Sequence, residues 1–360
     1  MTLLMTGFPG FLGSALLPRL LARRGDDRAY CLVPRRHLPA ARERLTALKA
    51  EHPDLVGRVT LLQGDLTAEH LGLTTKARSK LDDVDEVWHL AAVYDLAVPA
   101  EVARRVNVDG TARVLELAAG LPRLRHLHYV STCYVSGRYA GEFAEDVLEA
   151  GQEFRNHYEA TKYDAEVLVR KAMADGLPVT IYRPGIVVGD SSTGETQKYD
   201  GPYFLASFLR RQPRVALVPS VPPEARFCLV PRDFVIEAMD RLSANDDCVG
   251  RTYALTDPKP PTVRKVIETF AHVLGKRIVW VPVPERLTRG ALAYVPGLKR
   301  LLGLPAETVE YSTSPTTYST TNTLTDLEGT GVECPRFVDY ADRLLAYMTA
   351  HPEGGSEAMA

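Results

Sequence analysis

Short apolar runs alternate with stretches in which apolar residues recur every three or four positions along the first half of the chain. After the run at residues 3–5, Leu16, Leu17, Leu20 and Leu21 are spaced as on one face of a helix. Further strand-like runs follow at 29–33, 59–62, 87–90 and 126–137. Strands that alternate with helices predict an α/β fold built on a parallel sheet.

A glycine-rich turn joins the first predicted strand to the first helix, with glycines at every third position. Glycine at such places lets backbone N–H groups approach a pyrophosphate, while the positive end of the helix dipole faces the anion. Because a second strand follows one helix later, the turn predicts a dinucleotide site on a doubly wound parallel sheet, the Rossmann arrangement. The residues predicted to form this phosphate cradle are Gly7, Phe8, Pro9, Gly10, Phe11 and Leu12, with Gly13 as the third glycine.

Arg35 and Arg36 lie in the turn after the second predicted strand, where the end of the strand faces the adenosine ribose. Arginine at this place accommodates the 2′-phosphate of NADP, whereas a carboxylate would bind the ribose hydroxyl of NAD. No carboxylate lies in the turn. The turn therefore favours NADP over NAD, and the alternative is a solvated entry to the next helix.

The ends of the third and fourth predicted strands also suit a ligand. Asp65 and Leu66 follow the third strand, where a carboxylate suits the adenine amino group or, alternatively, caps a helix. Ala91 and Ala92 follow the fourth strand, and such small residues let a ligand lie across its end. His89 is given no role, because a histidine in an apolar strand is more often packed in the core.

Tyr158 and Lys162 lie four residues apart in a segment with helical spacing, so both face one side. A phenol with a pKa near 10 is a poor acid or base at neutral pH. A lysine ammonium about 4 Å away stabilises the phenolate by roughly 4 kcal/mol at an effective dielectric of about 20, at most about three pKa units. The pair therefore predicts a tyrosine acid or base near Ser131 and Thr132, the hydroxyls that follow the fifth strand.

An ordered set of motifs spans residues 1–190: TGFPGFLG, HLAA, NVDGT, YVSTCYVSG, YEATK and YRPGIVVGD. Over this range the chain resembles the extended short-chain dehydrogenase/reductase family. The resemblance implies that Tyr158 is the catalytic acid/base and that Lys162 modifies its pKa and contacts a ribose. It also implies that Thr132 hydrogen-bonds the reacting carbonyl, with Ser131 as the alternative.

Two further roles follow from the same resemblance. Asn107 would support a water link to Lys162. Pro184 and Ile186, at the end of the strand that follows the Tyr158 helix, would lie by the nicotinamide.

Within this family, the segment 189–204, GDSSTGETQKYDGPYF, is similar to the branch that reduces acyl thioesters. This similarity implies an NADPH-dependent reductase that transfers hydride to a thioester carbonyl and releases an aldehyde, or an alcohol after a second hydride. Three alternatives stay open: a dehydrogenase of a sterol-like or other secondary alcohol or ketone, a nucleotide-sugar epimerase or dehydratase, and a non-catalytic NADP-binding protein. Cys133 suggests covalent acyl capture, but a small buried thiol explains it better.

The domain organisation follows from the same patterns. Residues 1–190 are expected to form the NADP-binding core with the catalytic residues, and residues 191–351 mostly a smaller substrate-binding lobe interleaved with the sheet. Residues 352–360 are expected to be a disordered tail. The apolar segment 285–305 carries interspersed Arg and Lys. It suits a lid over an acyl chain or a membrane contact, but a core-packing pair of helices is favoured.

The composition of the chain limits the classes of partner that are expected. A formal net charge of -2 over 360 residues gives no reason to expect nucleic acid. Five cysteines lie far apart without a CxxC pair, which indicates neither a metal site nor disulfides and favours a reduced, cytoplasmic setting. No apolar run of about 18 residues occurs, so no membrane span is expected. A small acyl or carbonyl substrate is the expected partner, and the family resemblance adds a homodimer.

Overall fold

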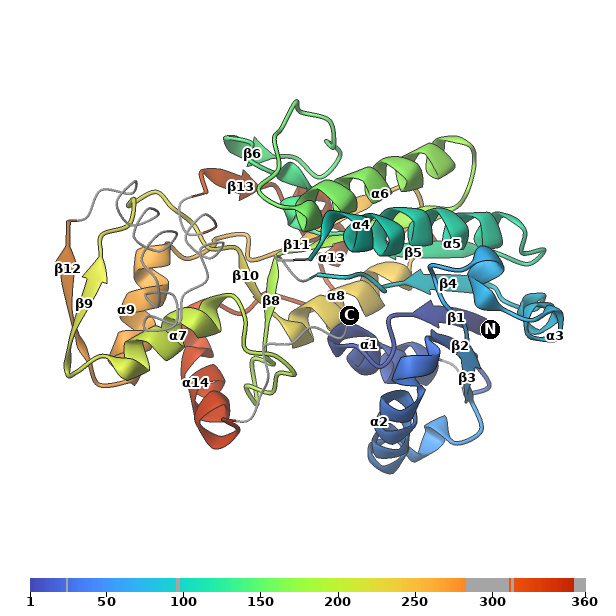
Figure 1. The fold of residues 1–360 in the computed structure, drawn as a ribbon, viewed down its shortest axis with the longest axis horizontal. Helices are drawn as coiled ribbons and strands as arrows, with labels where there is room; N and C mark the ends of the chain where they lie inside the picture. The colour runs from blue at the N-terminus through green and yellow to red at the C-terminus, as the bar shows by residue number, and fades with distance from the viewer. Residues whose placement is uncertain (24, 95–97, 283–310, 312–313, 353–360) are drawn as a thin grey trace.

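A parallel sheet forms the centre of the protein, for which the computed structural model describes residues 1–23, 25–94, 98–282, 311 and 314–352. In spatial order its seven strands are β11 (Thr252–Leu255), β7 (Val179–Pro184), β5 (His126–Val130), β4 (Glu86–His89), β1 (Thr2–Thr6), β2 (Arg28–Val33) and β3 (Val59–Gln63) (Figure 1). All neighbouring strands pair in parallel, and the strand order reverses between β1 and β4. The predicted doubly wound α/β fold is therefore confirmed.

Helices cover both faces of this sheet (Figure 1). On one face, side chains such as Leu17, Leu45 and Met239 pack into one apolar cluster, and on the other Val114 and Val169 belong to a second. The first face carries α1 (Phe11–Ala22), α2 (Leu38–Glu51), α8 (Arg232–Ser243) and α13 (Thr321–Leu327). The second face carries α5 (Gly110–Ala119) and α6 (His157–Ala174). The short α4 (Ala100–Ala103) contacts α6. α3 (Thr75–Arg78) lies in the connection from β3 to β4.

A separate apolar cluster holds together a smaller C-terminal lobe. Its elements are α7 (Pro202–Arg211), β9 (Val215–Pro219), α9 (Val263–Val273), β12 (Arg277–Val281) and α14 (Ala341–Ala350). Two short parallel pairs complete the fold: β8 (Ile186–Val188) with β10 (Leu229–Pro231), and β6 (Gly141–Phe143) with β13 (Thr316–Tyr318). α14 packs against α9, and α7 packs against the same helix, so the lobe has its own core.

The C-terminal half does not stay in this lobe. α8 and α13 pack on the sheet, and β11 adds its edge strand, although all three follow residue 190. The expected lid, membrane contact or helix pair at 285–305 lies outside the described residues. So does the expected disordered tail, apart from its first residue, Pro352.

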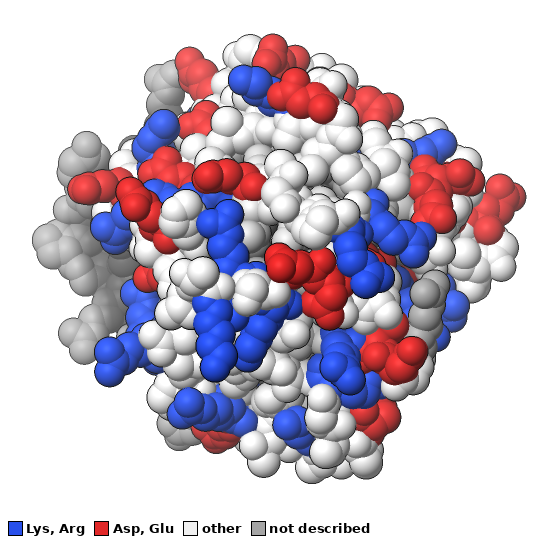
Figure 2. All heavy atoms as spheres, turned by 90° about the vertical axis from the view of Figure 1, so that its right-hand side faces the viewer, with Lys and Arg blue, Asp and Glu red and all other residues white. Residues whose placement is uncertain are grey.

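The surface charge is mixed. Figure 2 shows Lys and Arg interspersed with Asp and Glu over the face that carries the N-terminal part of the sheet, in keeping with the small net charge. Among the described residues, none of the helices is both long and apolar enough to cross a bilayer.

A row of aromatic and histidine side chains lies buried across the middle of the sheet. Trp88 stacks on His128 with ring centroids 4.0 Å apart, and His126 lies 3.9 Å from His128 on the same strand. His126 Nε2 shares a hydrogen bond of 2.8 Å with Thr180 Oγ1. Burial lowers the pKa of His126 to about 4 and that of His128 well below its usual value, so both rings are neutral in the folded protein.

We expect this pair of histidines to make the fold acid-labile. The unfolded chain binds protons at these rings near pH 6.5 and the folded chain does not, so stability falls as the pH drops below 6.5. The loss for His126 is about 3 kcal/mol by pH 4. Thermal or urea unfolding from pH 7 to 4 measures this slope, and His126→Gln should flatten it. An equal slope in the variant would contradict the assignment.

Candidate active site

A cavity of about 1010 Å³ opens at the carboxyl ends of the strands, where the strand order reverses. Open α/β sheets bind ligands at this place. The predicted residues that line it are Gly7, Phe8, Pro9, Gly10, Phe11, Leu12, Arg36, Asp65, Leu66, Ala91, Thr132, Tyr158, Lys162, Pro184 and Ile186. Arg35 and Asn107 are the predicted residues that do not line it.

The glycine turn leaves no room for side chains. Gly7 has a φ of 92°, and a Cβ on Gly7 would lie 2.9 Å from the Ala91 nitrogen. A Cβ on Gly10 or on Gly13 would lie 2.7 Å from the Gly7 carbonyl oxygen. α1 then starts without a capping side chain at Gly10, so the first N–H groups of the helix remain available to an anion. The turn therefore fits the pyrophosphate of a dinucleotide.

Three basic side chains surround the far end of the cavity. Arg36, His37 and Arg44 line it, and Arg36 Nε donates to His37 Nε2 at 3.1 Å. Arg44 Nε is buried and makes no hydrogen bond within the described part of the chain. Arg44 Nη1 lies 3.8 Å from Glu51 Oε1, whereas the unpartnered Nε fits a phosphate at this place. Sequence reasoning missed Arg44, although Ala40 and Arg44 are spaced to share one face of α2.

Asp65 holds a tight turn at the same end. Its Oδ1 accepts hydrogen bonds from the backbone nitrogen of Thr67 at 2.8 Å and from the Thr67 hydroxyl at 2.7 Å. Burial raises the pKa of this carboxyl, but the bonds to Thr67 and the Arg36 and Arg105 charges outweigh it and lower the pKa overall. Asp65 is thus an ionised acceptor in the cavity wall.

The hydroxyls of Ser131 and Thr132 point to different partners. Ser131 Oγ donates to Glu166 Oε2 at 2.6 Å, a short hydrogen bond that commits this hydroxyl to the buried carboxylate. Thr132 Oγ1 accepts from the Tyr134 nitrogen at 3.2 Å and interacts with the Tyr158 hydroxyl. Of the two, Thr132 is placed to share a substrate oxygen with Tyr158.

Lys162 approaches the sheet rather than Tyr158. It is 3% exposed, and its Nζ donates to the Tyr129 hydroxyl at 3.0 Å and to the Val130 carbonyl at 2.8 Å. Burial lowers the pKa of Lys162 to about 7, and the Glu166 charge opposes this shift. Burial likewise raises the pKa of Tyr158 to about 12, against the Thr132 hydrogen bond. Burial therefore dominates the pKa of Tyr158, and the expectation that Lys162 lowers this pKa stays a prediction.

Glu166 connects three parts of the site. It is fully buried, one turn after Lys162 on α6, and it accepts hydrogen bonds from Arg183 Nη2 at 2.6 Å and Arg170 Nε at 3.0 Å as well as from Ser131. Despite burial, these cations keep its pKa below the usual value, so it is ionised. Arg183 precedes Pro184, which lines the cavity. One carboxylate thus holds the ends of β5 and β7 against α6.

Asn107 lies in a π-helical turn, Arg104–Asp109, between α4 and α5. Its side chain accepts from the Val93 nitrogen at 2.8 Å and donates to the Val93 carbonyl at 3.0 Å and to Thr161 Oγ1 at 3.1 Å. These bonds fix the wall of the cavity to α6. The water link from Asn107 to Lys162 stays a prediction.

Two other residues are accounted for by packing. His89 is buried, and its ring nitrogens lie 2.7 Å from Thr6 Oγ1 and 3.0 Å from Thr111 Oγ1. Cys133 Sγ is buried and donates to the Arg183 carbonyl at 3.0 Å, and burial raises its pKa well above the usual value. A neutral thiol in that position is a poor nucleophile, which argues against acyl capture.

The substrate end of the cavity is lined by residues that the sequence did not suggest. They come from segments far apart in the chain: Tyr134, Phe204, Phe227 and Tyr311. Tyr134 and Tyr311 meet edge to face with ring centroids 4.8 Å apart. Sequence reasoning gave none of these side chains a role, because each belongs to a different element. Among the described residues, no group of three or more His, Cys, Asp or Glu is arranged to hold a metal ion.

We expect Gly13→Ala to impair dinucleotide binding. The new methyl would lie 2.7 Å from the Gly7 oxygen, so the turn must move and its N–H groups lose their alignment. Affinity for NADPH or NADH should fall at least about tenfold, which is about 1.4 kcal/mol. Fluorescence titration measures it, with Gly25→Ala as the control because nothing lies within 4 Å of that Cβ. Equal affinities in the two variants would contradict the cradle.

Comparisons with known proteins agree with this geometry. Residues 5–239 match the NAD-binding family described as "Male sterility protein". The crystal structure of the terminal R domain from the myxalamid PKS-NRPS biosynthetic pathway superimposes with a TM-score of 0.84 and 30% identity, covering 98% of this chain and 91% of that one.

Two curated relatives are much longer than this chain. The nonribosomal peptide synthetase asaC of Aspergillus flavus is 29% identical over 284 residues, which are 75% of this chain and 27% of that protein. The glycine betaine reductase ATRR of Emericella nidulans is 31% identical over 283 residues, which are 74% of this chain and 22% of that protein. The chain thus spans about a quarter of the length of these relatives. It belongs to the "Male sterility protein" family and, as its motifs predicted, to the NAD(P)-dependent oxidoreductases of the extended short-chain dehydrogenase/reductase type.

Proposed function

We propose that this chain reduces an acyl thioester to an aldehyde, with NADPH as the cofactor. The observation that carries the proposal is the match of the whole fold, at 30% identity over 98% of the chain, to a terminal R domain. The grouping of Thr132, Tyr158 and Lys162 in one cavity supports it. A carbonyl that gains negative charge on its oxygen needs hydrogen-bond donors at that atom.

In this proposal the side chains act on the substrate oxygen. The Thr132 and Tyr158 hydroxyls donate hydrogen bonds as charge develops, and Tyr158 then gives its proton to the oxyanion. Lys162, with a pKa near 7, carries a positive charge one helical turn away that offsets the resulting phenolate. From a thioester this gives a hemithioacetal, which collapses to an aldehyde and a thiol. Reduction of that aldehyde by the same residues would give the alcohol.

The cofactor end of the cavity fits NADPH. The glycine turn from Gly7 to Gly13 would hold the pyrophosphate, while Arg36 and Arg44 would hold the 2′-phosphate. NADPH bound there supplies the hydride. Arg35 does not line the cavity, so the arginine that assists Arg36 in this proposal is Arg44 and not Arg35.

A reducing, cytoplasmic setting is part of the proposal. All five cysteines are unpaired, and four of them are buried. Thiols persist unpaired where glutathione and thioredoxin keep them reduced.

We expect Tyr158→Phe to lose turnover roughly 10²-fold or more while it still binds NADPH, because the ring remains and the proton donor is gone. NADPH oxidation is followed at the nicotinamide absorbance with acyl-CoA thioesters, aldehydes, ketones and nucleotide sugars. Tyr163→Phe is the matched control, since Tyr163 lies on the same helix but packs against Phe154, with ring centroids 5.1 Å apart.

The substrate panel separates the competing functions. Turnover of a ketone or a nucleotide sugar without any thioester would keep the active site and refute the thioester proposal. Full activity of the Tyr158→Phe protein would refute the acid role and favour a cofactor-binding protein without catalysis.

We expect Arg44→Gln to raise the KM for NADPH roughly tenfold and to leave the KM for NADH unchanged, because one charged hydrogen bond to phosphate is lost. Steady-state kinetics with both cofactors measure this ratio. Arg42→Gln, on the same helix but outside the cavity, is the control for loss of charge. An equal change in the KM for NADPH and in the KM for NADH would mean that Arg44 does not bind the 2′-phosphate.

A further inference from the structure

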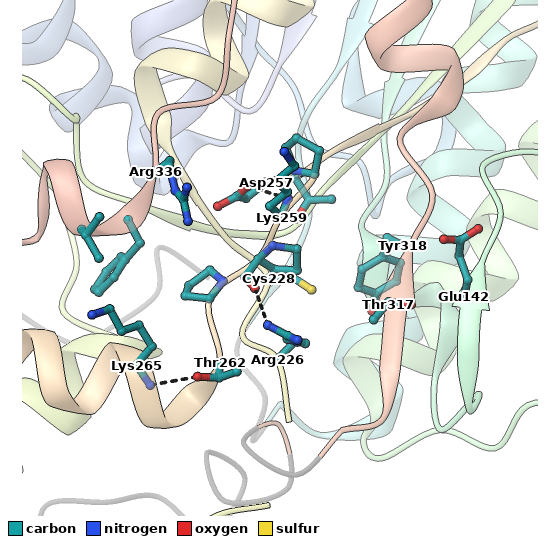
Figure 3. Close-up of a pocket in the computed structure, with 16 residues that line it drawn as sticks. Glu142, Arg226, Cys228, Asp257, Lys259, Thr262, Lys265, Thr317, Tyr318 and Arg336 are labelled. Carbon is teal, nitrogen blue, oxygen red and sulfur yellow. Dashed lines mark hydrogen bonds between the residues drawn. The ribbon is translucent and has the colours of Figure 1, made fainter. Parts of the chain in front are cut away.

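A second cavity of about 680 Å³ has a different set of lining residues (Figure 3). Its walls come from the start of α9, the segment 256–262 before it, the β6–β13 pair and the segment 336–338. Nothing in the proposed chemistry uses this cavity. None of Thr132, Tyr158 and Lys162 lines it.

Four basic side chains surround this cavity: Arg226, Lys259, Lys265 and Arg336 (Figure 3). None of them forms a salt bridge to a described residue. Their neighbour Arg264 differs, because it pairs with Glu268 at 2.9 Å and stacks over Trp280 outside the cavity. The four cations outnumber the two acids that line the same hollow, Glu142 and Asp257, so the site raises the local concentration of an anion.

The remaining polar groups of the cavity also favour an anion. Thr262 caps α9 by accepting from the Lys265 nitrogen at 3.0 Å, so the positive end of an eleven-residue helix faces this region. Thr256 Oγ1 is buried and hydrogen-bonds to no described N–H, hydroxyl or carbonyl group, while its interaction with the Cys228 thiol lowers the pKa of that thiol. Of the two acids in the wall, Glu142 is exposed, and burial raises the pKa of Asp257 against the opposing Lys259 backbone hydrogen bond and the Arg336 and Lys259 charges.

The second cavity shares a wall with the active-site cavity. Phe227 lines the active-site cavity, and the next residue, Cys228, lines the second one. Tyr134 and Tyr318 form a similar pair, with ring centroids 6.4 Å apart. A ligand in the second cavity would therefore press on residues that touch the substrate.

We propose that this second cavity binds the phosphate group of a phosphorylated ligand, with Lys259 and Lys265 as its main contacts. Two sources share this chemistry: the phosphate of the pantetheine handle of a thioester, which rests on the proposed function, and a separate phosphorylated metabolite. A phosphate takes up several charged hydrogen bonds at once, which matches a site with several cations and a buried hydroxyl.

The test measures binding rather than turnover. Inorganic phosphate, coenzyme A and pantetheine are titrated by calorimetry into the full chain with saturating NADPH, so that the cofactor cradle is filled. The same titrations use Lys259→Gln/Lys265→Gln and, as the matched control, Arg264→Gln. Both lysines are exposed, and a thermal unfolding scan checks that the double variant is folded.

We expect the double variant to bind phosphate and coenzyme A at least about tenfold more weakly than the unmodified chain, and Arg264→Gln to bind them within about twofold. Pantetheine, which lacks phosphate, should bind all three proteins alike. Equal phosphate binding by the double variant and the control, or no phosphate binding with NADPH present, would overturn the proposal.

Competition distinguishes the two sources. If coenzyme A displaces inorganic phosphate, the site takes the phosphate of the thioester handle. If both bind together and only phosphate binding depends on the two lysines, the site takes a separate metabolite. A chain that binds phosphate here but reduces no thioester would refute the proposed function and leave this site intact.

Discussion

The buried ion pair between Glu166 and Arg183 is the interaction on which the geometry of the active site depends. Glu166 is fully buried and Arg183 is 2% exposed, so neither charge has water as an alternative partner. Removing one partner of such a pair typically costs about 3–5 kcal/mol, because the other is left buried and unpaired. The pair holds the end of β7 against α6, and Ser131 adds the end of β5. Thr132, Lys162 and Pro184 are each next to, or one helical turn from, a member of this network.

The sequence was sufficient for the features that are local in the chain. Alternating strand and helix periods predicted the sheet, and Gly7, Gly10 and Gly13 mark the cradle because only a missing Cβ fits there. Other features depend on contacts between distant segments. Lys162 donates a hydrogen bond to Tyr129, which lies 33 residues earlier in the chain, and no spacing within one helix could predict that partner. Arg35 and Arg36 share a short 3-10 turn, in which neighbouring side chains point apart, so only one of them lines the cavity.

The C-terminal half contributes lining residues to both cavities because the chain passes repeatedly between the lobe and the sheet. It passes through the lobe, returns to the sheet as α8 and β11, and leaves again, so that residues from the crossings lie between the core and the lobe. Phe227 and Cys228 belong to one such crossing and line different cavities. The same path explains why composition gave no hint of the second cavity. Its four cations come from three regions of the sequence, around residues 226, 259–265 and 336, and form no run of charge.

The protonated form of Tyr158 fits the proposed reduction. A simple Coulomb estimate from the Tyr158–Lys162 spacing predicts a lowered pKa for the Tyr158 phenol. Burial acts in the opposite direction and raises the pKa of Tyr158 to about 12, so the phenol keeps its proton at neutral pH. A reduction consumes that proton, because the carbonyl oxygen must be protonated when hydride arrives. In the proposed reduction Lys162, one helical turn from Tyr158 on α6, offsets with its charged form the phenolate that remains after Tyr158 has given up its proton.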